Sequence, residues 1–389
     1  MRARLRTKPA DFDKKIGLVL QGGGALGSYQ AGVYEALAES GYHPDWIAGI
    51  SIGAINGAII AGNAPAERIS QLRGFWERIT APTTSFPFLP FTEAANRRWH
   101  AASALLFGRS GFFGPRPMTD WFGSPVSFYE ARALRSTLEA FIDFDRLNAG
   151  DTRFSVAAAN VRTGDFAYFD SREITIRPEH IMASAALPPG FPPVEIDGEH
   201  YWDGGLVSNT PLQYVLDYVP RRSRLTFQVD VFNAEGPLPA DLESAMEREK
   251  DIRYSSRTRA ATDMARVIHD VRHNINDLIE RLPDDLRASK EAQFLYDFGC
   301  VTRMDIVRLS YRPAEPQGQS KDYEFSAATM AQRWDQGLLD ARATLAESPW
   351  LVPMPSELGA RVFDGGWASN APAQTSLMAQ SRPAAAEPG

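Results

Sequence analysis

The sequence predicts an α/β fold in which helices cover a mainly parallel sheet. Two observations carry this prediction. The first 80 residues alternate short apolar runs with runs of helical spacing, and 44% of all residues are hydrophobic, close to the roughly 45–50% of globular proteins. A βαβα order is typical of parallel sheets, because each strand needs a crossover helix to reach its neighbour. The length of 389 residues allows two or three domains, or one large α/β domain with an extension.

Charge and cysteine content exclude several classes of protein. Lys and Arg number 41 and Asp and Glu 48, so the net charge of −7 provides no positive field for nucleic acid, and we expect no nucleic-acid partner. Cys300 is the only cysteine, which excludes an internal disulfide framework and a thiolate metal cluster.

Residues 1–14 form a basic N-terminal arm. The apolar run behind it, residues 16–20, is too short for the hydrophobic region of a signal peptide, so we expect a cytoplasmic protein. The arm has two interpretations, a solvated tail or a contact with an anionic membrane surface, and the sequence leaves both open.

The strands and helices of the N-terminal part follow from hydrophobic periodicity. Two strands are expected at residues 15–21 and 45–50, and three helices at residues 28–40, 52–60 and 66–79. Residues 46–66 carry no charge and repeat the G-x-x-x-G spacing of packed membrane helices. Their polar residues and Pro65 nevertheless favour a buried strand, turn and helix over a membrane span.

Residues 85–129 differ in composition from the rest of the chain. They hold 11 aromatic side chains, about twice the number expected from the average aromatic content of 11%. Glycines and prolines interrupt the segment, which favours a cover or loop layer that shapes an apolar groove or touches lipid. A packed satellite core explains the same composition equally well.

The remaining chain predicts two hairpins and then a mostly helical region. The hairpins and a further strand are expected at residues 153–161 with 166–170, 194–196 with 200–202, and 225–232. A short helix is expected near residues 179–186. From about residue 245 the chain shows apolar residues at helical spacing, then a strand at 301–311 and a helix from Ser326 towards residue 346. We therefore divide the chain into a first domain at 15–240, a mostly helical C-terminal extension at 241–350 and a disordered tail at 372–389.

A glycine loop, GGGALG at residues 22–27, joins the first strand to the first helix. Backbone N–H groups in this position can bind an anion, with the helix dipole behind them. The loop also fits G-x-G-x-x-G, so a dinucleotide oxidoreductase is an alternative. That alternative needs an acidic residue at the end of the second strand, where this chain has Ser51.

Ser51 lies in the pattern G-x-S-x-G, with Gly49 and Gly53. A serine on a sharp turn between a strand and a helix is the arrangement of a nucleophile elbow, and the glycines remove side chains that would collide there. A packing serine is the alternative, but the amide-rich loop one strand earlier favours a nucleophile.

A serine nucleophile needs a base, and the best candidate is Asp203. None of the six histidines has a signature of its own, whereas Asp203 ends a predicted strand in YWDGG, where Gly204 and Gly205 allow a tight exit. An ordinary Asp-Gly turn is the alternative. A second D-G-G copy begins at Asp364, but the sequence before it has no comparable strand pattern, so Asp203 is favoured.

Taken together, the glycine loop, G-x-S-x-G and D-G-G, with ASAALP at residues 183–188, resemble the patatin-like phospholipase family across residues 15–209. The resemblance implies a three-layer α/β/α sandwich with its catalytic domain at residues 15–240 and a Ser–Asp dyad without histidine. It makes Ser51 the nucleophile and Asp203 the base, and needs no metal or organic cofactor. The oxyanion hole that it implies consists of the backbone amides of Gly22, Gly23, Gly24 and Ala25.

The resemblance implies a lipid acyl-ester hydrolase of the phospholipase A or lysophospholipase type, working through an acyl-enzyme. Peripheral membrane contact would then involve residues 85–129 and the basic arm. The region after about residue 240 resembles the extension of a bacterial subset, some of it associated with 3-hydroxybutyrate metabolism. That association implies short hydroxyacyl esters as alternative substrates and 3-hydroxybutyrate dehydrogenase as a partner.

Two residues depart from the family pattern. Leu26 stands where Arg or Lys is common, and Gln21 where plant members have Asp. The missing cation puts charge support for an oxyanion or a lipid phosphate in doubt. It also keeps a second alternative open, a catalytically weak lipid-binding or scaffolding protein on the same fold.

Overall fold

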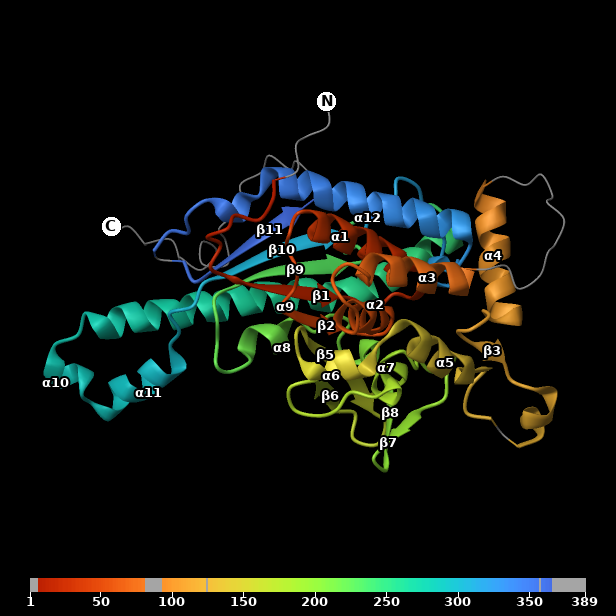
Figure 1. Ribbon diagram of the computed structural model, residues 1–389, viewed down its shortest axis with the longest axis horizontal. Coiled ribbons are helices and arrows are strands. Elements are labelled where there is room, and N and C mark those ends of the chain that lie inside the picture. The colour runs from red at the N-terminus through yellow and green to blue at the C-terminus, as the bar shows by residue number, and fades with distance from the viewer. Residues whose placement is uncertain (1–5, 81–92, 124, 357, 366–389) are drawn as a thin grey trace, which may run out of the picture.

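A nine-stranded sheet forms the centre of the molecule (Figure 1). The computed structural model describes residues 6–80, 93–123, 125–356 and 358–365. The strands lie in the order β11-β10-β9-β1-β2-β5-β8-β7, and β6 pairs with β5 beside this path. Their bounds are β1 Lys15–Leu20, β2 Trp46–Gly49, β5 Arg153–Asn160, β6 Phe166–Asp170, β7 Val194–Ile196, β8 Glu199–Asp203, β9 Arg224–Asp230, β10 Met304–Ser310 and β11 Ala360–Gly365.

Six strands of this sheet, from β11 to β5, run parallel to one another. Strand β1 lies between β9 and β2, with Leu20 opposite Val229 on one side and Gly49 on the other. Alternate side chains of β1 enter different cores: Leu18 packs with the helices of one face, and Val19 with those of the other. The expected three-layer α/β/α arrangement is confirmed.

The sheet ends in antiparallel strands. β5 pairs antiparallel with β6 and β8, and β8 pairs antiparallel with β7. These are the two predicted hairpins, and both are confirmed. The pairing of β5 with β8 sets Ala158 opposite Asp203, so the end of β8 lies beside the parallel part of the sheet.

Four helices cover the first face: α1 Ser28–Glu39, α2 Ile52–Ala61, α3 Arg68–Thr80 and α12 Ala327–Glu347. α1 and α12 cross at very close range, because each has a glycine at the crossing. A Cβ on Gly32 would lie 1.9 Å from the carbonyl oxygen of Trp334, and a Cβ on Gly337 would lie 2.1 Å from that of Tyr29. The C-terminal helix is therefore tightly joined to the first helix of the chain.

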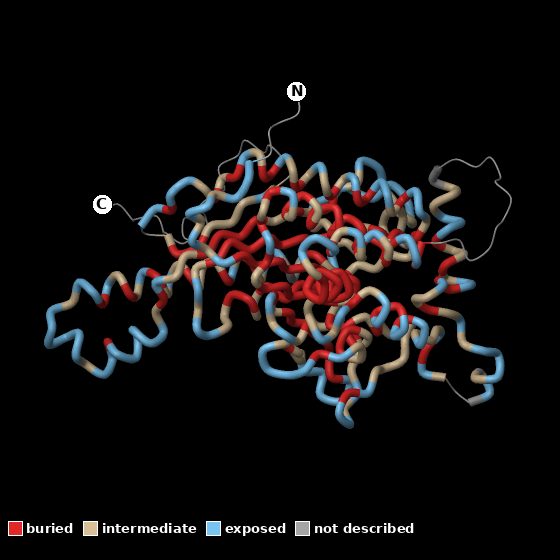
Figure 2. Tube along the Cα trace, in the orientation of Figure 1, coloured by how far each residue is buried: buried red, intermediate tan, exposed pale blue. Residues whose placement is uncertain are grey.

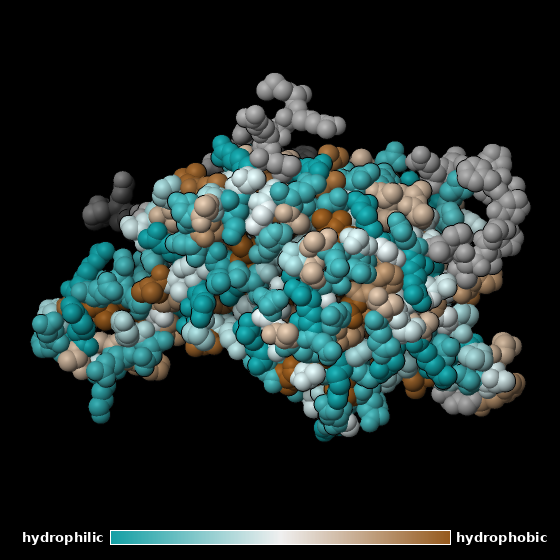
Figure 3. Space-filling model, in the orientation of Figure 1, coloured by the Kyte–Doolittle hydropathy of each residue, from teal (hydrophilic) through white to brown (hydrophobic). Residues whose placement is uncertain are grey.

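The second face is covered by α8 Leu212–Asp217 and the 39-residue helix α9 Leu242–Glu280. α9 runs past the edge of the sheet, where α10 Asp284–Arg287 and α11 Lys290–Phe298 extend away from the body (Figure 1). In Figure 2 the buried residues concentrate in the sheet and α2, whereas this extension is mostly exposed. The outer surface seen in Figure 3 is mostly hydrophilic, with hydrophobic side chains in small separate groups.

The other elements lie around the ends of the sheet. They are α4 Glu93–Phe107, β3 Gly114–Pro115, β4 Tyr129–Glu130, α5 Arg132–Phe141, α6 Phe144–Ala149, α7 Pro178–Ser184, and the short 3₁₀ helices η1 Gly24–Gly27, η2 Met118–Gly123, η3 Gly204–Leu206, η4 Lys321–Tyr323 and η5 Pro349–Leu351. No helix of the described ranges has both the length and the apolar character to span a membrane.

The C-terminal region is mostly helical, as predicted, but it also adds two strands to the sheet. β10 begins at Met304 rather than 301, and pairs in parallel with β9 and β11. β11 corrects one expectation, because the sequence before Asp364 does form a strand. The expected tail at 372–389, residues 1–5 of the arm, and Phe86, Phe88 and Phe91 of the aromatic segment lie outside the described residues.

Candidate active site

Ser51 occupies a sharp turn between β2 and α2. Its backbone has φ 55° and ψ −124°, a conformation that L-residues rarely adopt and that costs of order 1–3 kcal/mol. The Ser51 N–H donates to the Oγ of Ser184 at 3.0 Å, and Ser184 is itself fully buried at the end of α7. The turn is therefore held in place from a neighbouring helix.

The two glycines of the G-x-S-x-G pattern are required by backbone contacts. A Cβ on Gly49 would lie 2.4 Å from the carbonyl oxygen of Gly53, and a Cβ on Gly53 would lie 2.4 Å from that of Leu20. Any side chain at either position would push the turn away from β1. The predicted nucleophile elbow thus has the expected local structure.

Asp203 ends β8 and lines the same pocket as Ser51. The Ser51 side chain is near enough to lower the pKa of the Asp203 carboxyl, and the Gly205 N–H donates a hydrogen bond to Oδ1 at 2.7 Å. Only 3% of Asp203 is exposed. The following glycines fit this tight exit, because a Cβ on Gly204 would lie 2.8 Å from the carbonyl oxygen of Ala157.

Burial raises the pKa of the Asp203 carboxyl to about 7, although the hydrogen bonds from Gly205 and Ser51 act in the opposite direction. A carboxylate removed from water loses solvation, which favours its protonated form. With this pKa the carboxylate holds a proton more strongly than an exposed aspartate does. It is therefore a better base for a serine hydroxyl.

The glycine loop faces Ser51 and offers free backbone donors. Gly22, Gly23 and Gly24 line the same pocket as Ser51 and Asp203, whereas Ala25 is buried in the core. The Gly22 N–H already donates to the Asn209 carbonyl at 3.3 Å. Within the described ranges the N–H groups of Gly23 and Gly24, which line the pocket, have no acceptor.

Asn209 lies in the segment that follows Asp203 at the end of β8, and it holds the glycine loop in place through hydrogen bonds. Its Nδ2 donates to the Gly22 carbonyl at 2.9 Å, while its own carbonyl accepts from the Gly22 N–H. A Cβ on Gly22 would lie 2.5 Å from the Asn209 Oδ1 and 3.1 Å from the Ser51 Cβ. Asn209 therefore couples the glycine loop to the Asp203 turn.

Gln21 and Leu26, which depart from the family pattern, both lie in the interior. The Gln21 Oε1 accepts from the N–H groups of Val231 and Phe232 at 2.7 and 3.0 Å, so this side chain ties the glycine loop to the end of β9. Leu26 is fully buried in the hydrophobic core beneath the loop. Leu26 therefore contributes to the hydrophobic core, and it cannot provide the positive charge that Arg or Lys would offer to an oxyanion or a lipid phosphate.

A pocket with about 660 Å³ of empty space opens over Ser51 and Asp203. Aromatic side chains form much of its wall, and two of them, Phe112 and Phe113, come from the aromatic segment. A neighbouring pocket of about 790 Å³ is lined by four of the same residues, namely Phe112, Phe113, Ala185 and Phe191. The segment is thus divided, because Phe113 is buried while Phe122 is 93% exposed.

The C-terminal region supplies the opposite wall of the Ser51 pocket. Tyr254 comes from α9, and Asp322, Tyr323 and Phe325 come from η4 and the residues after it. Burial raises the pKa of the Tyr254 and Tyr323 hydroxyls, and the nearby charge of Asp203 adds to this effect. Both tyrosines are therefore neutral donors at the edge of the site.

Sequence reasoning predicted the residues at the centre of the pocket and missed those around it. Asp364, the second D-G-G aspartate, forms an ion pair with Arg308, and its side chain is 61% exposed. Ser184 lies in the ASAALP stretch, and Phe112 and Phe113 lie in the aromatic segment that was expected to shape an apolar groove. The residues that were missed carry no local motif, and they are Phe191, Asn209, Tyr254, Asp322, Tyr323 and Phe325.

Comparison with curated proteins finds fungal lysophospholipases. The chain is 42% identical to the lysophospholipase nte1 of Aspergillus terreus over 84 residues, which is 19% of this chain and 6% of that protein. It is 25% identical over 227 residues to the lysophospholipases NTE1 of Pyricularia oryzae and Saccharomyces cerevisiae, which is 58% of this chain and 13% and 11% of those proteins. The chain therefore spans only a small part of the length of these relatives.

Among solved structures, similarity is found to VipD from Legionella pneumophila, with 14% identity, a TM-score of 0.33, and coverage of 86% of this chain and 70% of that one. The human GIVD cytosolic phospholipase A2 has 12% identity, a TM-score of 0.35, and coverage of 86% of this chain and 60% of that one.

Two family models match the chain. One described as patatin phospholipase matches residues 252–357, which include η4 and most of α9. The other, described as patatin-like phospholipase, matches residues 18–216 and so contains the glycine loop, Ser51 and Asp203. Because this second match covers just over half of the sequence, the chain belongs to the patatin-like phospholipase family.

Proposed function

We propose that this protein is a serine hydrolase of lipid acyl esters that uses Ser51 and Asp203 as a catalytic dyad. One observation carries the proposal: Ser51 lines one pocket together with the buried Asp203 carboxyl and two free backbone N–H groups. A nucleophile, a base with a raised pKa and oxyanion donors are the parts that acyl transfer requires.

The reaction would proceed in two halves. As the Ser51 Oγ attacks the ester carbonyl carbon, Asp203 takes the hydroxyl proton and the carbonyl oxygen becomes an oxyanion. The N–H groups of Gly23 and Gly24 stabilise this charge, and each such donor is worth roughly 3 kcal/mol in the transition state. The alcohol then leaves with the proton from Asp203. Water, giving its proton to Asp203, cleaves the acyl-enzyme, and the released serine regains it.

The substrate class that fits best is a phospholipid or lysophospholipid. The fungal relatives are named lysophospholipases, and the pocket wall of Phe112, Phe113 and Phe191 suits an acyl chain. Short hydroxyacyl esters, and an association with 3-hydroxybutyrate dehydrogenase, stay predictions of the family resemblance.

We also propose that the enzyme approaches its lipid at a membrane surface. Met118 and Phe122 of η2 are 81% and 93% exposed, and Phe128 is 52% exposed. Such large apolar side chains, close in sequence to Phe112 and Phe113 of the pocket wall, suit insertion between lipid headgroups.

Replacing the dyad tests the function. Ser51→Ala and Asp203→Asn are each expected to lower kcat on nitrophenyl butyrate and lysophosphatidylcholine by about 10³-fold or more, because nucleophile and base act as one unit. A fluorophosphonate probe followed by peptide mass spectrometry should label Ser51 in the wild type. Rates on phospholipid, lysophospholipid, triglyceride and 3-hydroxybutyryl esters then define the substrate.

Asp364→Asn is the matched control, since Asp364 starts the second D-G-G copy and lies on the edge strand β11. It should retain activity within about twofold, as surface substitutions usually do. Retention of most activity by Ser51→Ala would reject the dyad. Lipid binding without turnover in the wild type would instead favour the scaffolding alternative.

A further inference from the structure

Residues 317–325, here called the C-terminal wall, lie against the proposed active site although they follow Ser51 by more than 260 residues. Asp322, Tyr323 and Phe325 of this wall line the Ser51 pocket. The wall also contacts the glycine loop directly, since η1 and η4 pack together.

The contact with the loop is made by backbone atoms. A Cβ on Gly24 would lie 2.4 Å from the carbonyl oxygen of Asp322, so the Gly24 backbone approaches this carbonyl closely. Gly24 has φ +54° and carries one of the two free N–H groups. A displacement of Asp322 would therefore remove the support on one side of a proposed oxyanion donor.

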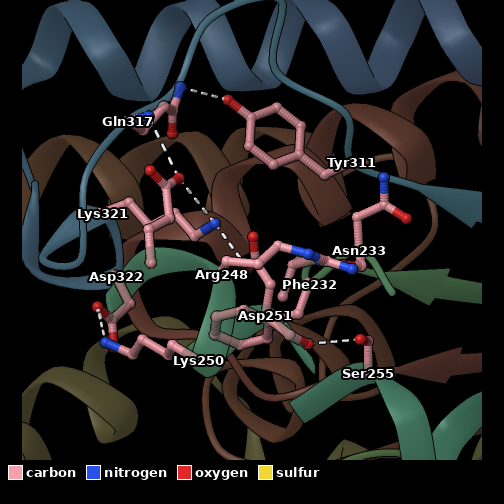
Figure 4. A network of polar contacts seen from close by, with 12 residues as sticks. Phe232, Asn233, Arg248, Lys250, Asp251, Ser255, Tyr311, Gln317, Lys321 and Asp322 are labelled. Atoms are coloured by element: carbon pink, nitrogen blue, oxygen red, sulfur yellow. Dashed lines mark hydrogen bonds and ion pairs between the residues drawn. The ribbon is translucent and has the colours of Figure 1, made fainter. Parts of the chain in front are cut away.

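A buried ion-pair cluster attaches the wall to α9. Lys321, the residue before Asp322, donates its Nζ to the Glu247 Oε1 at 3.1 Å and to the Asp251 Oδ1 at 2.6 Å. The exposed fractions of these side chains are 5% for Lys321, 10% for Glu247 and 14% for Asp251. We call these three residues the Lys321 cluster; Figure 4 draws its surroundings.

Further contacts fix the same wall from α9. The Glu247 carboxylate also accepts from the N–H groups of Gln317 and Gly318 at 3.2 and 2.9 Å. Lys250, one helical turn further, donates to the Asp322 Oδ1 at 2.5 Å (Figure 4). The start and the middle of the wall are thus tied to a single helix.

From the other side, Arg333 of α12 donates to the carbonyl oxygens of Lys321 and Glu324 at 2.9 and 3.2 Å. The wall is therefore held between two helices of the C-terminal region. The hydrogen bonds that hold the C-terminal wall are directional, so they define its position better than apolar packing alone would.

Buried ion pairs contribute little net stability, because removing the charges from water costs about as much as their attraction returns. Their more specific effect is geometric, since a lysine between two carboxylates allows only a few arrangements. The Lys321 cluster is therefore better explained by what it positions than by what it adds to the free energy of unfolding.

We propose that Lys321 is a positioning residue for ester hydrolysis, which holds the Asp322 carbonyl against Gly24 and thereby sets the oxyanion donors. This inference rests on the proposed function. It assigns to the C-terminal region a part in the reaction itself, in addition to its part in the sheet.

The test compares Lys321→Met with wild type in two independent measurements. The first is the steady-state hydrolysis of nitrophenyl butyrate, where we expect kcat to fall about 10-fold or more while KM changes less than about twofold. A misplaced donor weakens transition-state binding, while the apolar side chains of Phe112, Phe113 and Phe191, which lie outside the C-terminal wall, keep their positions. The second is hydrogen–deuterium exchange, where the peptide covering residues 21–27 should exchange faster while the peptides of β1 and β9 do not change.

Two further variants provide a second test and a matched control. Glu247→Gln keeps an acceptor for Gln317 and Gly318 but removes one charge, so it should change both readouts in the same direction by a smaller factor. Lys321→Met leaves two buried carboxylates unpaired and can therefore fail to fold. In that case Glu247→Gln alone provides the test. Lys15→Met removes a surface lysine paired with Asp45 and is the matched control, expected to resemble wild type.

The outcomes separate this proposal from the proposed function. Unchanged exchange of residues 21–27 in folded variants overturns the positioning role, as does a loss of activity that only follows the unfolded fraction. If Ser51→Ala equals wild type in hydrolysis, the dyad fails, and the exchange of residues 21–27 alone still decides whether Lys321 positions the loop.

Discussion

At the scale of single residues, the proposed chemistry depends on Asp203, which is buried and has few contacts that stabilise its charged form. Two hydrogen bonds, from Ser51 and Gly205, do not compensate for its lost solvation, so its pKa rises to about 7. The proposed dyad can therefore use an aspartate where many serine hydrolases use histidine, because a general base works best when its pKa is near the working pH.

The pH dependence of hydrolysis follows from that pKa. Only the deprotonated carboxylate can accept the Ser51 proton, so kcat/KM should rise with pH, reach half its maximum near pH 7 and level off above it. At pH 5 we expect about 1% of the plateau rate, since the deprotonated fraction falls tenfold per pH unit. A rate profile for nitrophenyl butyrate between pH 4 and 9 measures this, with Lys15→Met as control. A midpoint near pH 4 would contradict it.

The sequence predicts the centre of the site because the relevant constraints are local. Gly49 must be glycine because of the Gly53 backbone four residues later, and the G-x-S-x-G motif records this local requirement. Asn209 and Ser184 act through side-chain contacts with segments more than 130 residues away. A single sequence shows no such pairing, so their roles become visible only in the fold.

At the scale of elements, most predicted strands and helices are confirmed, and β11 shows why a short strand can escape prediction. Strand β11 was not expected, because ARVFDG is short and borders a low-complexity tail. It is a strand because β10 provides parallel backbone partners from Met304 to Leu309. Tertiary pairing, rather than the propensity of the segment, decides such short elements.

The aromatic segment combines both interpretations that its composition left open. Phe113 packs in the core near Phe191, with ring centroids 5.5 Å apart, whereas Phe122 is 93% exposed. One end of the segment thus shapes the pocket, and η2 presents apolar side chains to solvent. The second feature supports the proposed membrane contact.

Replacing exposed residues of η2 tests that contact. We expect Phe122→Ser to lower binding to phosphatidylcholine vesicles, and hydrolysis within them, by about tenfold or more, because burying a phenylalanine side chain is worth roughly 1.5–3 kcal/mol. Hydrolysis of soluble nitrophenyl butyrate should not change. Phe294→Ser on α11, where the side chain is 73% exposed, is the matched control. Equal vesicle binding by both variants and wild type would exclude η2 as the contact.

At the scale of the whole molecule, the boundary at residue 240 separates two sequence patterns but not two sheets. Strands β10 and β11 extend the sheet beyond β9, and α12 packs closely on α1. The Ser51 pocket likewise draws its walls from both sides of the boundary. Sequence patterns show where hydrophobic periodicity changes along the chain. They do not show that strands on the two sides of residue 240 pair in one sheet, because that pairing is defined only by the fold.

The last prediction concerns this shared architecture. A chain ending at residue 240 would leave the β9 edge open and remove Trp334, Ile306 and Val307, each at most 1% exposed. Each such side chain contributes roughly 1.5–3 kcal/mol, against a total free energy of unfolding of about 5–15 kcal/mol. We therefore expect this fragment to show no cooperative thermal transition by circular dichroism, and to elute as aggregate in size-exclusion chromatography. A chain ending at residue 365 is the control, because it keeps every described helix and strand, and its Tm should stay within about 2 °C of wild type. Cooperative unfolding and ester hydrolysis by the 1–240 fragment would show instead that the N-terminal part folds and works alone.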